Sequence, residues 1–190
     1  PGFGPVEVSI VDAANPLVFV KASDLGLTGK ELPSELDNDA EKLELLEKVR
    51  GMAAVKLGLC DDYTRSAWDT PGIPKMTFVA PAADYTTVTG QEISADKIDL
   101  LSRMMSMQKT HPTYAMTGAM CTAAAAIVPG SVVQQVLQPD VDTQFIRIAH
   151  PGGILEAGVD YTVDENGCVD VEDTFGFRTA NLLAEGTAFC

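Results

Sequence analysis

Apolar residues recur at helical spacing over residues 42–59 of this chain. Those that share one face are Leu43, Leu46, Val49, Ala53 and Leu57. The spacing predicts an amphipathic helix that Gly58 closes. A second helix is predicted over residues 94–107, with Ser94 as its N-terminal cap. On it Lys97, Arg103 and the following Lys109 are expected to face outward, while the methionines fill gaps in the core.

Shorter runs rich in β-branched and aromatic residues predict strands. An Asn-Pro turn divides two such runs within residues 8–20, and further strands are expected over residues 75–80, 131–137, 143–150, 154–161 and 168–177. Strands lie on both sides of the helices without strict alternation of strand and helix. The pattern therefore predicts an α+β fold, and residues 1–190 suffice for a single domain.

A polar segment, residues 108–121, leads into a short helix of small apolar residues that ends at Pro129 and Gly130. Thr113 or Thr117 is expected to cap its first turn. A buried helix N-terminus presents unpaired N–H groups and the positive end of the helix dipole, which suits a carboxylate or phosphate near Thr117 and Gly118. Small residues also let a helix pack closely against a sheet, so the pattern alone fits either role.

Charge and composition narrow the function classes. The formal net charge of -14 argues against nucleic acid as a partner. No run of 18 apolar residues and no signal-peptide pattern is present. We therefore expect a cytoplasmic location and no membrane partner. The acidic residues gather in residues 31–47 and 160–173, as solvated faces rather than metal sites. Local cations such as Lys109 and Arg147 are expected to serve an anion site.

Four cysteines stand at positions 60, 121, 168 and 190. Their spacing is neither clustered nor regular, which favours free thiols over a zinc site or a disulfide framework. Cys121 lies in the small-residue helix and is interpreted as a buried hydrophobe rather than a nucleophile.

Several segments together resemble the PrpF family, the 2-methylaconitate cis-trans isomerases of the diaminopimelate epimerase superfamily. They are the Asn-Pro turn within residues 8–20, Asp-Leu-Gly-Leu-Thr-Gly at 24–29, Ile-Val-Pro-Gly at 127–130, the His150 turn within 146–155, and residues 178–186. The resemblance implies a mixed, mostly antiparallel sheet curled as a barrel around a central helix. It also implies that the chain matches the second half of a two-domain isomerase.

In such an isomerase the active site lies between the two domains, and the catalytic Lys and Cys belong to the first. The resemblance therefore implies no catalytic residue in this chain, with Met116 near the position of the related epimerases' cysteine. The 190 residues alone are expected to be inactive for want of the first domain. The tail, residues 179–190, is expected to cross to the first domain. When the first domain is absent, the chain is expected to form a homo-oligomer through this tail.

The resemblance assigns this half a carboxylate-binding role. The implied substrate-binding residues are Asn15, Lys109, His111, Met116, Thr117, Gly118, Ala119, His150, Pro151, Gly152 and Gly153. Gly152 replaces a serine of the family pattern, and Gln108 replaces a glycine. The implied ligand is a small di- or tricarboxylate, and proton abstraction and return need neither a metal nor an organic cofactor.

Three other functions stay open. The substrate class extends to methylitaconate and oxalomesaconate, whose isomerases belong to the same superfamily. The chain also fits a non-catalytic carboxylate-binding module. A purely structural or interaction domain is favoured if the chain's own side chains cover Thr117 and Gly118.

Overall fold

The structure, a computed structural model, describes residues 3–177 and 182–186 and confirms the α+β class. One mixed sheet has the strand order β1-β2-β3-β6-β8-β9-β10, and a short strand, β7, pairs with β6. The strands are β1 (Val8–Asp12), β2 (Pro16–Lys21), β3 (Lys75–Pro81), β6 (Leu100–Ser106), β7 (Lys109–Thr110), β8 (Phe145–His150), β9 (Gly153–Val163) and β10 (Val169–Gly176). A separate two-stranded ribbon pairs β4 (Tyr85–Thr86) with β5 (Glu92–Ile93).

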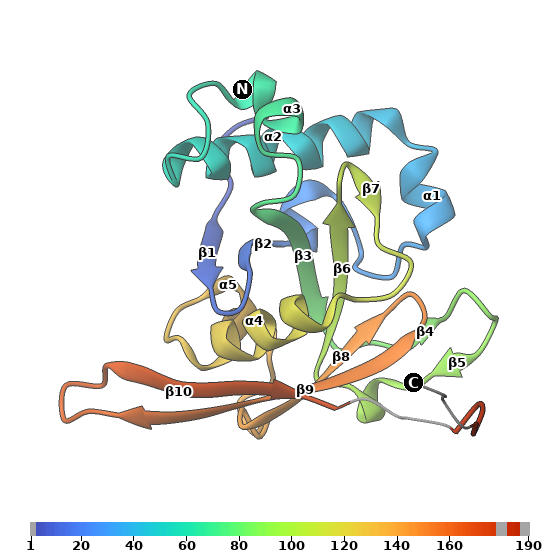
Figure 1. Ribbon diagram of the computed structural model, residues 1–190, viewed down its shortest axis with the longest axis vertical. Helices are drawn as coiled ribbons and strands as arrows, with labels where there is room; N and C mark the ends of the chain where they lie inside the picture. The colour runs from blue at the N-terminus through green and yellow to red at the C-terminus, as the bar shows by residue number, and fades with distance from the viewer. Residues whose placement is uncertain (1–2, 178–181, 187–190) are drawn as a thin grey trace.

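The sheet curls around one central helix, α4 (Met116–Ile127), as expected. α4 contacts β1 and β2 at one edge of the sheet and β9 and β10 at the other, and the latter two run beneath it in Figure 1. Its four consecutive alanines, residues 123–126, are all buried, because small side chains let the surrounding strands approach the helix closely.

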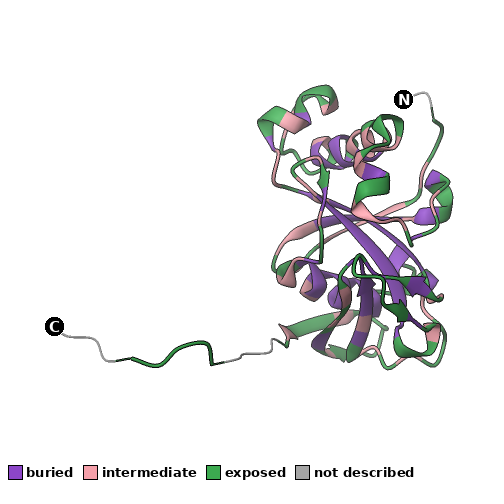
Figure 2. Ribbon diagram, turned by 90° about the vertical axis from the view of Figure 1, so that its right-hand side faces the viewer, coloured by how far each residue is buried: buried purple, intermediate pink, exposed green. Residues whose placement is uncertain are grey.

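The opposite face of the sheet is covered by α1 (Pro33–Asp37) and α2 (Ala40–Lys56). The central strands are consequently buried on both faces, which Figure 2 shows as purple strands between the two helical layers. Along β2, Leu17 and Phe19 pack toward α4, while Val18 and Val20 pack toward α2. The remaining helical turns are η1 (Ala22–Leu25), η2 (Tyr63–Arg65), α3 (Ser66–Asp69), η3 (Ala95–Lys97) and α5 (Val132–Val136).

The helix predicted over residues 94–107 is wrong. Only the turn η3 is helical there, and the chain continues as β6 at the centre of the sheet, between β3 and β8. A strand buried on both faces reads as a continuous apolar run, so its period of two is hidden. The outward orientation predicted for Arg103 is also wrong, since its side chain is 0% exposed, whereas Lys97 and Lys109 are exposed.

The strand predicted over residues 131–137 is wrong as well, because Val132–Val136 forms the short helix α5. Ser131 caps it: its Oγ accepts the N–H of Gln134 at 3.0 Å. The valines of α5 pack on the core around α4, so tertiary packing and the cap override their β-propensity.

The other predicted elements are confirmed with shifted ends. The helix predicted over residues 42–59 is α2, and its cap is Asp39, which accepts the N–H of Lys42. Leu57, predicted on its apolar face, lies at the C-cap and is 42% exposed, so its place on that face is wrong. The strands over residues 75–80, 143–150, 154–161 and 168–177 correspond to β3, β8, β9 and β10. No helix within residues 3–177 or 182–186 is long and apolar enough to cross a membrane.

The predicted crossing of the tail falls largely on residues 178–181 and 187–190, which lie outside the described residues. Within the described part of the tail, Leu182 and Leu183 are 83% and 95% exposed.

Candidate functional site

The N-terminus of α4 has no side-chain cap. Ala115 occupies the cap position in an extended conformation, so the prediction that Thr113 or Thr117 caps this helix is wrong. The N–H of Ala119 bonds to the carbonyl of Ala115 at 2.9 Å. Within the described parts of the chain, no acceptor is assigned to the N–H groups of Met116, Thr117 and Gly118. These N–H groups therefore remain available as hydrogen-bond donors at the positive end of the helix dipole.

The first residues of α4 differ in their exposure to solvent. Thr117 is exposed and Gly118 is buried. A Cβ added at Gly118 would lie 2.1 Å from Cε of Met104, so the end of the Met104 side chain packs directly on this glycine and would have to move for a larger residue. Gly118 therefore serves the packing of α4. Its neighbour Thr117 is accessible to an anion.

The turn between β1 and β2 lies against the same helix start. Asn15 donates from Nδ2 to Oγ1 of Thr117 at 3.4 Å. Ala14, just before it, has a φ of +68°, a left-handed conformation that turns the chain toward α4. The structure thus brings Asn15 and Thr117 together from positions 102 residues apart.

The turn between β8 and β9 approaches from the other side, where His150 pairs with Gly153. Nδ1 of His150 accepts the N–H of Gly152 at 3.0 Å, so a neutral ring carries its proton on Nε2. Burial, and then the charges of Arg103 and His111, lower the pKa of His150 from 6.5 to about 4. At neutral pH His150 is therefore a hydrogen-bond donor and not a cation.

His150 and Met116, the first residue of α4, border an open pocket of about 540 Å³, whose lining does not include Asn15 or Thr117. Its lining includes Thr113, Met116 and His150. His111 lies beside it, because its Nδ1 accepts the N–H of Thr113 at 3.1 Å. Gly152 also faces Thr113, whose Cγ2 would lie 3.0 Å from an added Cβ.

Three of the predicted site residues have other roles. The N–H of Ala119 is used inside the helix, and the carbonyl of Pro151 accepts the N–H of Val88. Lys109 pairs with Ser106 at the end of the β6–β7 hairpin, outside the residues that line the pocket.

Among the described residues, the cation that lines the pocket is Lys97, which the sequence does not predict there. Arg147 bonds to the carboxylate of Asp99 at 2.7 Å, whereas Lys97 lines the pocket. The sequence pattern predicts Lys97 on the outer face of a helix, and nothing in the local sequence indicates that the turn η3 brings it to the pocket.

Two buried groups, one in α4 and one just before it, are unsuited to proton transfer. Cys121 is fully buried, its Sγ donates to the carbonyl of Val11 at 3.3 Å, and burial raises its pKa to about 11. Burial likewise raises the pKa of Tyr114 to about 12, and its hydroxyl bonds to those of Ser102 and Thr122. The interpretation of Cys121 as a packing residue agrees with its burial.

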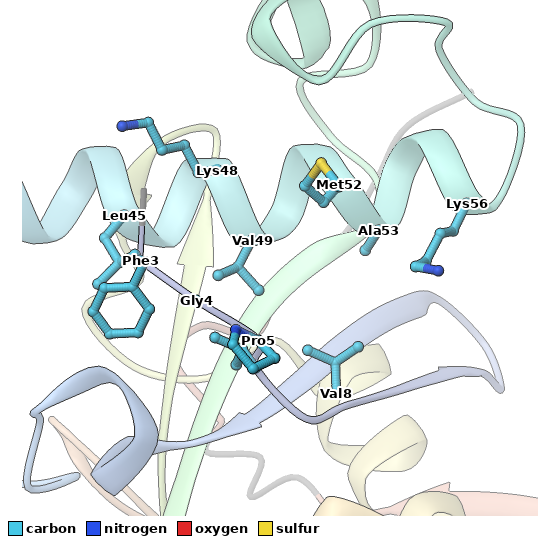
Figure 3. Close-up of a pocket in the computed structure, with 11 residues that line it drawn as sticks. Phe3, Gly4, Pro5, Val8, Leu45, Lys48, Val49, Met52, Ala53 and Lys56 are labelled. Carbon is cyan, nitrogen blue, oxygen red and sulfur yellow. The ribbon is translucent and has the colours of Figure 1, made fainter. Parts of the chain in front are cut away.

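A different pocket, of about 240 Å³, lies between α2 and the segment before β1 (Figure 3). Phe3, Leu45 and Val49 contribute to its largely apolar walls, and Lys48 on its edge pairs with Glu44 at 2.6 Å. Among the described residues, no group of three or more His, Cys, Asp or Glu is arranged to hold a metal ion. The α4 start therefore offers the more polar set of groups.

Comparison with known proteins gives a consistent result. The family described as PrpF protein matches residues 1–190. The 3-methylitaconate isomerase of Eubacterium barkeri is 38% identical over 98% of this chain and 48% of its own length. The 2-methyl-aconitate isomerase of Shewanella oneidensis is 33% identical, over 98% and 46% respectively. The (4E)-oxalomesaconate Delta-isomerase of Novosphingobium is 30% identical, over 96% and 45%.

A solved structure of a methylitaconate-delta-isomerase superposes with a TM-score of 0.81 at 35% sequence identity. The match covers 93% of this chain and 47% of that one. The chain spans about half the length of the relatives it matches.

Proposed function

The chain belongs to the PrpF family, and from this we propose that the protein isomerises an unsaturated di- or tricarboxylic acid by moving a proton next to a carboxylate. The three relatives above are isomerases named for three different acids of this kind. Their shared chemistry supports the substrate class, and their differences leave the individual acid open.

The observation that carries the proposal is the uncapped start of α4 beside Asn15. Donors gather there: the N–H groups of Met116 and Thr117, and the Asn15 amide. Such fixed donors suit a carboxylate, and they also stabilise the charge that develops when a proton leaves the neighbouring carbon. Lys97 brings a positive charge to the pocket that Met116 lines, together with the negative charge of Glu156.

We propose further that the acid and base come from a second unit of similar size. The relatives are about twice as long as this chain, which supports a two-part enzyme. The pKa values of Cys121 and Tyr114 are raised and that of His150 is lowered, so none of them exchanges a proton readily near pH 7. This half then binds carboxylates, and its partner unit carries out the proton transfer.

The test measures deuterium uptake from D₂O into 2-methylaconitate or methylitaconate by proton NMR. The chain joined to such a second unit is expected to exchange the proton, and the 190 residues alone are not. Asn15→Ala and Thr117→Val in the joined form should slow exchange at least tenfold, because each removes a group at the helix start. Asn38→Ala is the matched control, since the side chain of Asn38 bonds only to the carbonyl of Ser34 in α1 among the described residues.

Exchange by the 190 residues alone would show that the acid and base lie in this chain. Carboxylate binding without exchange in either form would favour the non-catalytic binding module.

A further inference from the structure

Arg103 is a buried charge that forms no salt bridge among the described residues, although Glu31 and Glu35 act on it from a greater distance. It lies on the central strand β6, on the face that points away from α4, and it is 0% exposed. Among the described residues no carboxylate lies within ion-pair distance of it, and its Nη2 has no hydrogen-bond partner. Burying an unpaired guanidinium costs several kcal/mol, so its position calls for an explanation other than stability.

The guanidinium bonds to main-chain carbonyls of separate segments. Nε donates to Glu31 at 2.7 Å, and Nη1 donates to Ser102 at 2.9 Å and to Ala149 at 3.3 Å. The group also lies over the ring of Tyr85, 5.5 Å from its centre. Burial lowers the pKa of Arg103 to about 10, so it remains charged at neutral pH.

Several of these contacts bind the main chain of the turn that contains His150, residues 149–153. Ala149, the residue before the turn, is held by Arg103 itself. Gly153, at the end of the turn, accepts the hydroxyl of Tyr85 at 2.5 Å. Between them the carbonyl of Pro151 accepts the N–H of Val88 at 2.8 Å. Three carbonyls of one short turn are therefore fixed by Arg103 and the segment that contains Tyr85 and Val88.

We propose that Arg103 is a positioning residue, which holds the His150–Gly153 turn at the pocket by binding Ala149 directly and Gly153 through Tyr85. The proposal rests on the function proposed above, in which this turn borders the carboxylate site. The fork shape of the guanidinium explains why arginine is used: one planar group reaches the carbonyls of Glu31, Ser102 and Ala149 together.

The electrostatics of the turn agree with this geometry. Arg103 and His111 are the charged or titratable groups that lower the pKa of His150, after burial itself. Lys97 and Glu156 line the same pocket as His150. The charge behind the turn thus helps to keep the imidazole neutral, with Nδ1 free to accept the N–H of Gly152.

The test compares Arg103→Met with Arg50→Met. Arg50 is the control for loss of a buried arginine: it also binds main-chain carbonyls, those of Thr70 and Ile73, but it lies on α2 and pairs with Glu47 at 2.6 Å. The chain has two histidines, so NMR follows both imidazoles through a pH titration, and His111→Gln identifies their signals. Both arginine variants are expected to unfold more easily, but only Arg103→Met should raise the His150 pKa, by about one unit.

Tyr85→Phe gives a second, milder variant that removes one hydroxyl. It is expected to shift the amide signals of Gly152 and Gly153 and to weaken binding of trans-aconitate severalfold. If neither Arg103→Met nor Tyr85→Phe changes the titration or the amide signals of the turn, the positioning role is wrong. An Arg103→Met chain that does not fold leaves Tyr85→Phe to decide. If the unaltered chain binds no trans-aconitate, the proposed function fails, while the titration and amide signals still test Arg103.

Discussion

Replacing His150 with glutamine is expected to remove a large part of the acid sensitivity of this fold. His150 is buried and neutral in the folded chain, and its pKa falls from 6.5 to about 4, through burial first and then through Arg103 and His111. Because the folded state takes up the proton less readily, this contribution to stability is fully present above pH 6.5. It is lost as the pH falls toward 4.

The size of the effect follows from the pKa difference. One unit corresponds to about 1.4 kcal/mol, so the full loss is about 3 kcal/mol, of which about 2 kcal/mol is lost by pH 5. Glutamine can still accept the N–H of Gly152 through its side-chain oxygen, but it takes up no proton in this range.

The assay is urea unfolding at pH 8 and pH 5, with fluorescence of the single Trp or circular dichroism as the signal. Acidic groups such as Glu7, whose pKa is lowered by its bonds to Gln135 and Lys21, act in both proteins and cancel. The free-energy difference between the native chain and His150→Gln should therefore change by about 2 kcal/mol between the two pH values. His111→Gln is the control. An equal pH dependence in the native chain and in His150→Gln would refute the buried, neutral state of His150.

Two further predictions concern packing. Cys121→Ala should lower the free energy of unfolding by about 1 kcal/mol and leave trans-aconitate binding unchanged, since its thiol is buried; a hundredfold loss of affinity at unchanged stability would contradict this. Gly29→Ala should cost about 2–3 kcal/mol against about 1 for Gly130→Ala. Both glycines have positive φ, but an added Cβ lies 2.7 Å from Ala80 only at Gly29, so equal losses in urea unfolding would contradict the close approach.

The sequence predicts the parts of the fold whose faces differ in polarity. α2 has one apolar face, and β9 and β10 end in turn residues, so their types follow from pattern. The central strand β6 does not, because Leu100, Leu101, Met104 and Met105 are buried on both faces. The short α5 depends on the Ser131 cap and on packing against the α4 core, which local propensity does not record.

The candidate site is likewise predicted in part from the sequence. The resemblance assigns both the start of α4 and the Asn15 turn to the site, and the structure brings them into contact, but the sequence predicts a threonine cap that the helix does not have. The roles of Lys97 and Arg103 do not follow from the sequence, because its pattern predicts both on the outer face of a helix that does not form. Lys109 stays a prediction: it lies at the end of the β6–β7 hairpin and, like Asn15 and Thr117, is not among the residues that line the pocket.

The central claim is that a substrate carboxylate binds at the start of α4. Its most direct test is a titration of the ¹⁵N-labelled chain with trans-aconitate, followed by the amide signals. Saturable shifts are expected at Met116, Thr117 and Gly118 and at the side-chain amide of Asn15, because these groups surround the free donors. Saturable shifts confined to the apolar pocket around Val8 and Val49, or no saturable shift at all, would contradict the claim.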